Sequence, residues 1–376
     1  MSATLPRVKV PFTDLSWQWR AISDAALPEI EELMQTSAFC LGPFVSRFED
    51  AFASYLAARH VVGVNSGTSA LHLAMICAGV GPGDKVLVPV NTFAATAWAV
   101  VYAGATPVFC DVDAATSNLD VKDAERRLTR EVKAVIPVHL YGQPADMQAV
   151  TAFAAKHRLA VVEDAAQAVG VRQNGKAIGT IAPMGCFSFY PGKNLGAAGE
   201  GGAVATADDA AAERLRALRH HGQRKRYVHD EIGFNYRMEG IQGLILWHKL
   251  KHLDAWTQMR KKLAARYIER LSGLPLALPR PLAGDHVYHL FVIHTPRRDA
   301  LKAFLEERGI ETGLHYPVPL HRQPCFAHLE MDRGSYPVAE RLAAEALSLP
   351  IFPGMTEAQQ DAVIDSVGEF FGRQPR

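Results

Sequence analysis

Cysteine is scarce in this sequence, and no two cysteines are spaced as a pair. The five cysteines are scattered through mostly apolar surroundings, their number is odd, and there is no Cys-x-x-Cys motif. This distribution argues against a disulfide-stabilised secreted domain and against a cysteine-rich zinc site. We therefore expect reduced, packed thiols in a cytoplasmic protein.

An excess of charge of one sign is missing as well. The 40 Lys and Arg residues nearly balance the 39 Asp and Glu residues, which leaves a formal net charge of +1. A chain without a global field has no general attraction for nucleic acid or for an anionic membrane. We expect no nucleic-acid partner and no membrane partner, so any binding must be local.

An uninterrupted hydrophobic run long enough for a membrane helix is the third absence. The most apolar long stretch, residues 94–110, contains Gly104 and Pro107 and predicts a helix followed by a strand. The first twenty residues mix charged and aromatic side chains and lack the apolar segment of a signal peptide. With 376 residues, of which 48% are hydrophobic, the chain can instead form a large core and two domains.

Short apolar runs recur along the first 210 residues and predict the strands of a mainly parallel sheet. They lie at 61–64, 85–90, 106–112, 134–141, 159–164, 186–189 and 202–206, separated by helical stretches such as 71–78, 94–103 and 146–158. Strands that are apolar on both sides suit a parallel sheet covered by helices on both faces. The sequence therefore predicts an α/β fold.

The domain organisation follows from the same pattern. We expect a large domain over residues 1–250, with an N-terminal arm at 1–25 that lies on a partner surface. A long helix opening at 232 would lead to a smaller α/β domain over 251–376, with a strand near 287–294 and a helix at 298–308.

One lysine lies between an apolar strand and a glycine-rich turn. Pro191 and Gly192 end the strand just before Lys193, and four glycines follow between 196 and 202. A desolvated amine has a lowered pKa and forms a Schiff base with an aldehyde. The alternative is a lysine that pairs with a carboxylate at a turn. A nucleotide P-loop fails, because Phe187 and Asn194 stand where that motif needs glycine and Ser or Thr.

Two further signals lie at expected strand ends. The turn at 65–69 precedes a helix, where free N–H groups and the helix dipole bind anions, although a plain N-cap would look the same. Asp164 ends the strand at 159–164 and should be desolvated. Its partner is either a structural cation or the protonated ring nitrogen of a cofactor.

Two other clusters carry weaker signals. The basic segment 220–227 predicts a solvated loop, with a ligand diphosphate as the second interpretation and nucleic acid as a distant third. The histidine pairs 286/289 and 315/321 have no Cys or acidic residue to complete a metal site. We expect no metal.

Pyridoxal 5'-phosphate (PLP) unites the main signals. Its phosphate needs an anion site such as the 65–69 turn, and its ring needs a stacking face such as Phe93. Its pyridinium needs a carboxylate such as Asp164, and its aldehyde needs an amine such as Lys193. These four groups in this order are not expected by chance, so the sequence predicts a PLP site.

Five motifs also make the sequence resemble the DegT/DnrJ/EryC1/StrS sugar aminotransferases of PLP fold type I. They are Asn-Ser-Gly-Thr-Ser-Ala-Leu (65–71), Glu-Asp-Ala-Ala-Gln (163–167), Ser-Phe-Tyr-Pro-Gly-Lys-Asn-Leu-Gly (188–196), Gly-Phe-Asn-Tyr-Arg (233–237) and His-Tyr-Pro-Val-Pro-Leu-His (315–321). The resemblance covers nearly the whole chain. It implies the aspartate aminotransferase-like fold, with a mainly parallel seven-stranded sheet in the large domain.

The resemblance also implies roles for individual residues. Lys193 would bind the cofactor aldehyde and move protons, and Asp164 would pair with the pyridinium. The implied cofactor-binding residues are Ser66, Gly67, Thr68, Phe93, Asp164, Gln167, Ser188, Lys193 and Asn235. Asn235 would reach the phosphate of the neighbouring subunit, which makes a homodimer with shared sites. The implied substrate-binding residues are Phe39, Tyr190, Arg237, His315, Tyr316 and His321.

The implied reaction is transfer of an amino group from L-glutamate to a keto-sugar. With Lys193 the chain resembles the transaminases of the family, because the dehydratases of the family carry histidine at this position. Gln167 and its context are similar to members that aminate C-3 of a dTDP-linked 3-keto-6-deoxyhexose. A UDP-sugar or cyclitol aminotransferase is an alternative, and a non-catalytic PLP-binding regulator is an alternative of another class.

Overall fold

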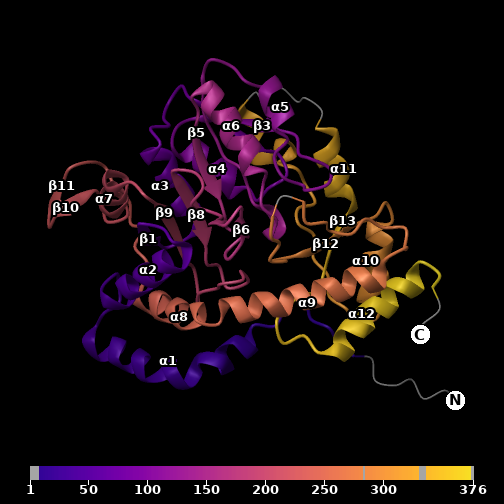
Figure 1. The fold of residues 1–376 in the computed structure, drawn as a ribbon. Coiled ribbons are helices and arrows are strands. Elements are labelled where there is room, and N and C mark those ends of the chain that lie inside the picture. Colours follow the sequence, from indigo (N-terminus) through magenta and orange to yellow (C-terminus); the bar gives the residue numbers. More distant parts are fainter. Residues whose placement is uncertain (1–7, 283, 330–335, 374–376) are drawn as a thin grey trace.

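A seven-stranded sheet forms the centre of the computed structural model, which describes residues 8–282, 284–329 and 336–373. Its strands are β1 (His60–Val64), β2 (Lys85–Pro89), β3 (Thr106–Cys110), β4 (Val132–Val135), β5 (Ala160–Asp164), β8 (Met184–Ser188) and β9 (Gly202–Thr206). Their order is β1-β9-β8-β5-β4-β2-β3, and only the pairings of β9 are antiparallel. The predicted mainly parallel α/β sheet is confirmed (Figure 1).

Helices cover both faces of this sheet. The helices are α2 (Pro43–Leu56), α3 (Gly67–Cys77), α4 (Ala95–Tyr102), α5 (Val121–Arg126), α6 (Met147–His157), α7 (Asp209–Leu218) and α8 (Gly240–Leu250). Neighbouring strand residues serve different faces: Val61 belongs to the hydrophobic cluster under α2, α6 and α8, and Val62 belongs to the cluster under α3, α4 and α7. Two buried faces explain why the strand sequences are almost continuously apolar.

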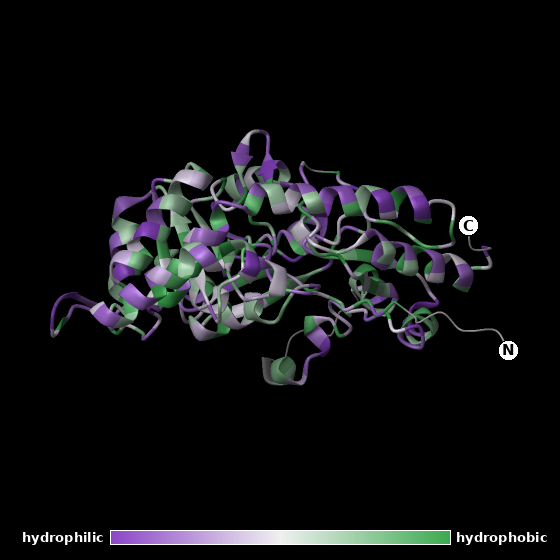
Figure 2. Cartoon of the chain, turned by 90° about the horizontal axis from the view of Figure 1, so that it is seen from below, coloured by the Kyte–Doolittle hydropathy of each residue, from purple (hydrophilic) through white to green (hydrophobic). Residues whose placement is uncertain are grey.

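The C-terminal part has its own hydrophobic cluster, formed by α9 (Leu253–Leu271), β12 (Phe291–His294), α10 (Arg298–Glu306), β13 (Ala346–Leu349) and α12 (Glu357–Phe370). Helix α11 (Pro337–Glu345) instead packs into the cluster of the large sheet. β12 and β13 pair antiparallel. Helices at the periphery show hydrophilic and hydrophobic residues together (Figure 2), as expected of helices with one buried side. The domain boundary near residue 250 stays a prediction.

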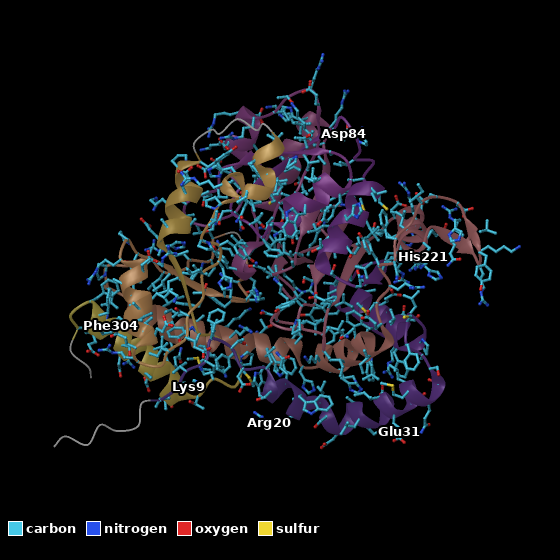
Figure 3. The ribbon with its side chains drawn as sticks, turned by 180° about the vertical axis from the view of Figure 1, so that it is seen from behind. Lys9, Arg20, Glu31, Asp84, His221 and Phe304 are labelled. Carbon is cyan, nitrogen blue, oxygen red and sulfur yellow. The ribbon has the colours of Figure 1, made fainter. Side chains whose placement is uncertain are left out.

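The start of the chain differs from the expected arm. Helix α1 (Ser16–Thr36) begins well before residue 25 and runs below α8 (Figure 1), and Arg20 and Glu31 mark its outer side (Figure 3). Val10 is fully buried and bridges Ile310 of the same chain, and Trp17 packs edge-on against Trp256. Residues 8–17 are therefore anchored on their own C-terminal part. Residues 1–7 lie outside the described part.

Two local predictions were wrong and one was right only in part. The helix expected from residue 232 begins only at Gly240 and is separate from α9, because Asn235 and Arg237 form bridges with His220 and Val64. The basic segment is exposed at residues 224–227, as expected of a solvated loop, but it forms a projecting hairpin of β10 (Gln223–Lys225) and β11 (Val228–His229). The strand expected at 134–141 ends at Val135, and a one-turn 3-10 helix (Leu140–Gly142) follows, with Tyr141 at a φ of 62°.

No helix in these described ranges combines the length and the apolarity that a membrane span requires.

Candidate active site

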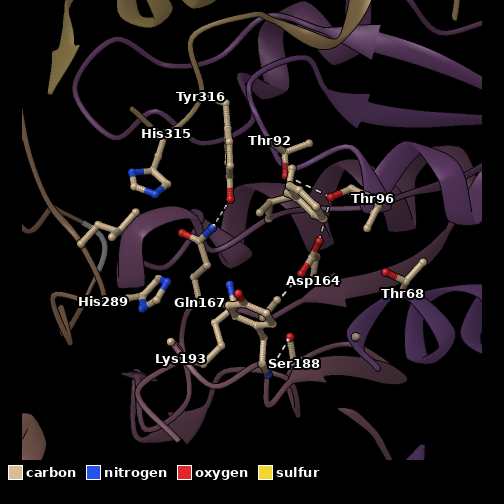
Figure 4. Close-up of a pocket in the computed structure, with 18 of the residues that line it drawn as sticks. Thr68, Thr92, Thr96, Asp164, Gln167, Ser188, Lys193, His289, His315 and Tyr316 are labelled. Carbon is tan, nitrogen blue, oxygen red and sulfur yellow. Dashed lines mark hydrogen bonds between the residues drawn. The ribbon is translucent and has the colours of Figure 1, made fainter. Parts of the chain in front are cut away.

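A cavity of about 800 Å³ opens at the carboxyl ends of β5 and β8 and extends to the C-terminal part of the chain. Ligands of open α/β sheets bind at this edge. Eleven of the residues singled out from the sequence line it: Ser66, Gly67, Thr68, Phe93, Asp164, Gln167, Ser188, Tyr190, Lys193, His315 and Tyr316. Figure 4 shows the polar side chains converging on one space.

The N-terminus of α3 forms one end of the cavity. The Ser66 hydroxyl accepts a hydrogen bond from the Ser69 backbone N–H (3.1 Å), which is the N-cap predicted as an alternative. Gly67 lies so close to Ser188 that an added Cβ would be 2.7 Å from the Ser188 Cβ. Thr68 and Ser188 both line the cavity at this helix terminus. The first N–H groups of a helix have no partner within the helix, so an N-cap at Ser66 is compatible with an anion site here.

Asp164 lies at the end of β5 and is only 5% exposed. Its Oδ2 accepts a hydrogen bond from the Thr96 hydroxyl (2.8 Å), and its Oδ1 accepts one from the Ala166 backbone N–H (3.2 Å). Burial raises the pKa of this carboxyl, and these hydrogen bonds and the charge of Lys193 oppose that rise. A cation placed against Asp164 would therefore be strongly favoured.

Lys193 follows β8 on a turn whose backbone is closed by the Lys193 N–H and the Tyr190 carbonyl (2.8 Å). Desolvation lowers the pKa of its amine to about 8, and the charge of Asp164 opposes this shift. Near neutral pH a useful fraction of this amine is unprotonated, which an ordinary surface lysine does not offer.

Gln167 is held by two tyrosines. Its Oε1 accepts a hydrogen bond from the Tyr141 backbone N–H (2.6 Å), and its Nε2 donates to the Tyr316 hydroxyl (3.1 Å). The Tyr141 hydroxyl in turn donates to the His315 carbonyl oxygen. Phe93 is 50% exposed and lies 5.7 Å from the Tyr316 ring, so one face of Phe93 remains open to the cavity.

Four residues singled out from the sequence are not brought into this cavity. Phe39, Asn235 and Arg237 lie together on one edge, because Cys40 bridges Glu239 and Arg237 donates to the Asn235 Oδ1 (2.7 Å). His321 instead contacts Glu340 through its Nε2 (3.0 Å).

Several cavity residues were not assigned to the site by the sequence analysis, and one of them, His289, was considered only as a metal ligand. They are Phe12, Thr13, Thr92, Thr96, Trp98, Glu200, Arg260 and His289. The hydroxyls of Thr92 and Thr96, four residues apart, form a hydrogen bond with each other (3.0 Å), and the Thr96 hydroxyl also donates to Asp164. The i, i+4 spacing of these threonines around Phe93 is the sequence signal that could have indicated them. The Nδ1 of His289 lies 3.3 Å from the Asn194 Oδ1, a contact that no short motif could have indicated.

The two cavity histidines are neutral at physiological pH. Burial and the charge of Lys193 lower the pKa of His315 to about 4, and burial with the same charge lowers the pKa of His289 well below its usual value. Among the described residues, no three His, Cys, Asp or Glu side chains are grouped as metal ligands.

These residues fit PLP as a bound group. Gly67 has no side chain and lies against Ser188, so backbone N–H groups at the start of α3 and the Ser188 hydroxyl could together receive a phosphate. Phe93 has a free aromatic face, the buried Asp164 favours a cation, and Lys193 has a lowered pKa. One chain therefore offers a group for the phosphate, the ring, the ring nitrogen and the aldehyde of PLP, and a partner subunit could add further contacts.

Comparison with known proteins agrees with this chemistry. The family model described as the DegT/DnrJ/EryC1/StrS aminotransferase family matches residues 20–368. A "pleiotropic regulatory protein" of Geobacillus stearothermophilus is 45% identical over 97% of this chain and 99% of its own length. The dTDP-3-amino-3,4,6-trideoxy-alpha-D-glucose transaminase of Streptomyces venezuelae is 45% identical over 99% of both chains.

A solved structure extends the similarity to three dimensions. The crystal structure of S. venezuelae DesV in complex with a ketimine intermediate has a TM-score of 0.94 and 45% identity, covering 98% of this chain and all of that one. The family model spans far more than half of the sequence, and its members depend on PLP. The chain belongs to the DegT/DnrJ/EryC1/StrS aminotransferase family.

Proposed function

We propose that this enzyme binds PLP and transfers an amino group from L-glutamate to the C-3 keto group of a dTDP-linked 6-deoxy-keto-hexose. The product would be an amino sugar nucleotide for amino-sugar biosynthesis. The observation that carries the proposal is the placement of Lys193, with a pKa of about 8, beside the buried Asp164 in one cavity. The similar S. venezuelae transaminase supports the nucleotide and the class of sugar.

The residues of the cavity divide the work. PLP, when bound, supplies the aldehyde that takes up an amino group and the ring that accepts electrons. Asp164 would keep the ring nitrogen protonated, and Thr96 fixes the direction of its carboxylate. Lys193 would carry the proton between its Nζ and the reacting carbon, in one direction for the donor and in the other for the sugar. Gln167, held by Tyr141 and Tyr316, would orient the ring oxygen.

The active unit is proposed to be a homodimer. Phe39, Asn235 and Arg237 come from distant parts of the chain yet lie together on one edge, and none of them lines the cavity of its own chain. Nearby α1 exposes Trp19 (42%), Leu27 (54%) and Met34 (56%), which is costly for an uncovered helix. A second copy placed on this face would cover the apolar residues and bring Asn235 and Arg237 to the partner's cavity.

Two other functions remain as alternatives. A UDP-linked keto-sugar or a cyclitol could use the same cofactor site, since the acceptor contacts are the least defined part of the cavity. A regulator that binds PLP without catalysis is the alternative of another class, and the printed name of the Geobacillus relative is the observation that favours it. An enzyme turns over, whereas a regulator only binds.

The test is an acceptor panel with the purified full-length protein, PLP and L-glutamate. dTDP-linked and UDP-linked 3-keto and 4-keto sugars and an inosose are supplied separately, and amino products are identified by mass spectrometry. We expect turnover with the dTDP-linked 3-keto sugar at least tenfold faster than with the others. Preference for a different acceptor would reassign the substrate, and binding without any turnover would favour the regulator.

A further inference from the structure

Arg260 is a buried cation in the wall of the active-site cavity. It projects from α9, is 5% exposed, and lines the cavity together with His289, Leu290 and Ile351. Its Nη1 donates to the backbone carbonyls of Tyr288 (3.2 Å), His289 (3.4 Å) and Ile351 (2.8 Å). Three carbonyls on one nitrogen fix the plane of the guanidinium.

The charge of Arg260 has no acidic partner. Within the described ranges no Asp or Glu forms an ion pair with it, whereas the similarly buried Arg219 bonds Glu49 at 2.5 Å. Burial lowers the pKa of Arg260 only to about 10, so the group stays charged at neutral pH. A buried guanidinium without a counter-ion is unfavourable unless a ligand supplies one.

The free edge of the guanidinium has the geometry of a carboxylate receptor. Nε and Nη2 make no hydrogen bond to any described residue, since all three bonds of this side chain use Nη1. These two nitrogens form one edge of the planar group and can bind both oxygens of a carboxylate at once.

Arg260 also lies on the correct side of the cavity. Its guanidinium donates to the backbone carbonyl of His289 (3.4 Å), and Arg260, His289 and Lys193 line the same cavity. In Figure 4, Thr68 at the anion-binding helix terminus lies on the opposite side of Asp164 from His289. An anion at Arg260 is therefore distinct from the cofactor phosphate and close to the reactive amine.

We propose that Arg260 forms the subsite for the carboxylate of the amino donor, an α-amino acid. This inference rests on the proposed function, because the donor must present its amino group beside Lys193 while its carboxylate is held. The neutral His289 and His315 line the same cavity and add no positive charge beside Arg260, so the guanidinium of Arg260 recognises the anion on this wall.

The first experiment measures the donor half-reaction alone, which needs no sugar. Full-length protein loaded with PLP is mixed with L-glutamate, and the change in cofactor absorbance is followed for wild type, Arg260→Met and Arg260→Lys. Arg266→Met is the matched control, since Arg266 lies on the same helix but bonds Gln360 and Asp361 of α12 and does not line the cavity. We expect kcat/KM for glutamate to fall about 30-fold or more in both Arg260 variants, mainly through KM.

A second experiment uses the wild-type protein without cofactor, so that a folding defect in a variant cannot decide the outcome. Phenylglyoxal modifies accessible arginines, and the modified positions are identified by mass spectrometry with and without succinate, a dicarboxylate that cannot react. We expect succinate to protect Arg260 and to leave Arg266 equally modified.

The outcomes are separable from those of the acceptor panel. If Arg260→Met exchanges amino groups with glutamate at the wild-type rate, or if succinate does not protect Arg260, the inference is overturned. If donor exchange fails in the variant but no keto-sugar accepts an amino group, the proposed acceptor is wrong and the donor subsite stands.

Discussion

At the scale of single residues, the site depends on how burial changes two opposite charges. Desolvation lowers the pKa of Lys193 and raises that of Asp164, and each charge partly counteracts the shift of the other. In the protein without ligand, these shifts favour a neutral amine at Lys193 and a carboxyl at Asp164 whose ionised form is stabilised by a nearby cation. Lys193 is thus suited to react with an aldehyde, and Asp164 is suited to bind a protonated ring nitrogen beside it.

Capture of the cofactor should follow the titration of Lys193. Only the neutral amine attacks an aldehyde, so the rate of PLP capture by cofactor-free protein should fall about tenfold per pH unit below pH 8 and level off above it. In Asp164→Asn the midpoint should move to lower pH, because the charge that stabilises the ammonium is lost. Stopped-flow absorbance measures both profiles.

A control is needed because Lys249 also has a pKa lowered to about 8 by burial. Lys193→Ala should abolish capture, and borohydride reduction of the wild-type protein should attach the cofactor to Lys193 alone. Attachment to Lys249, or an unchanged rate in Lys193→Ala, would contradict the assignment.

At the scale of elements, the end of the cavity at the N-terminus of α3 is built by close contact of α3, β8 and β9. A Cβ on Gly202 would lie 2.3 Å from the Ser66 carbonyl carbon and 2.7 Å from the Gly67 nitrogen. Both contacts are with backbone, which cannot rotate away. The first strand residue of β9 therefore sets the position of the helix terminus.

Gly202→Ala should displace this turn. We expect a loss of about 1–3 kcal/mol in the free energy of unfolding and weaker PLP binding. Gly81→Ala is the control, since nothing lies within 4 Å of its added Cβ. Urea denaturation and a PLP titration measure the two effects, and equal behaviour of the two variants would show that the contact at Gly202 is not limiting.

The elements also show what sequence could and could not predict. Apolar runs located all seven strands of the sheet, because each strand is buried on both faces. The segment 232–239 was misjudged as helix, since its bridges to His220 and Val64 depend on residues far away in the chain. Arg260 was missed, and His289 was considered only as a metal ligand, for the same reason: their surroundings arise only when α9 and the loop before β12 meet the sheet.

At the scale of the whole molecule, one chain supplies most of a site but not all of the residues singled out for it. Lys193 and Asp164 lie inside the cavity, whereas Asn235 lies on a separate edge beside Arg237. Helix α1 and the turn at Phe39, which is 49% exposed, border this edge and present apolar surface. These positions lead to the proposal that each site is completed by a second copy.

Mixed dimers test this sharing directly. Lys193→Ala and Asn235→Ala chains carrying different tags are co-expressed, and the dimer with both tags is purified. If Asn235 serves the partner's cavity, one site of the mixed dimer has both changes and the other has neither. Half of the sites should then bind PLP with wild-type affinity and exchange with glutamate at the wild-type rate. If each chain uses its own Asn235, every site carries one change, and no site with wild-type affinity should be found.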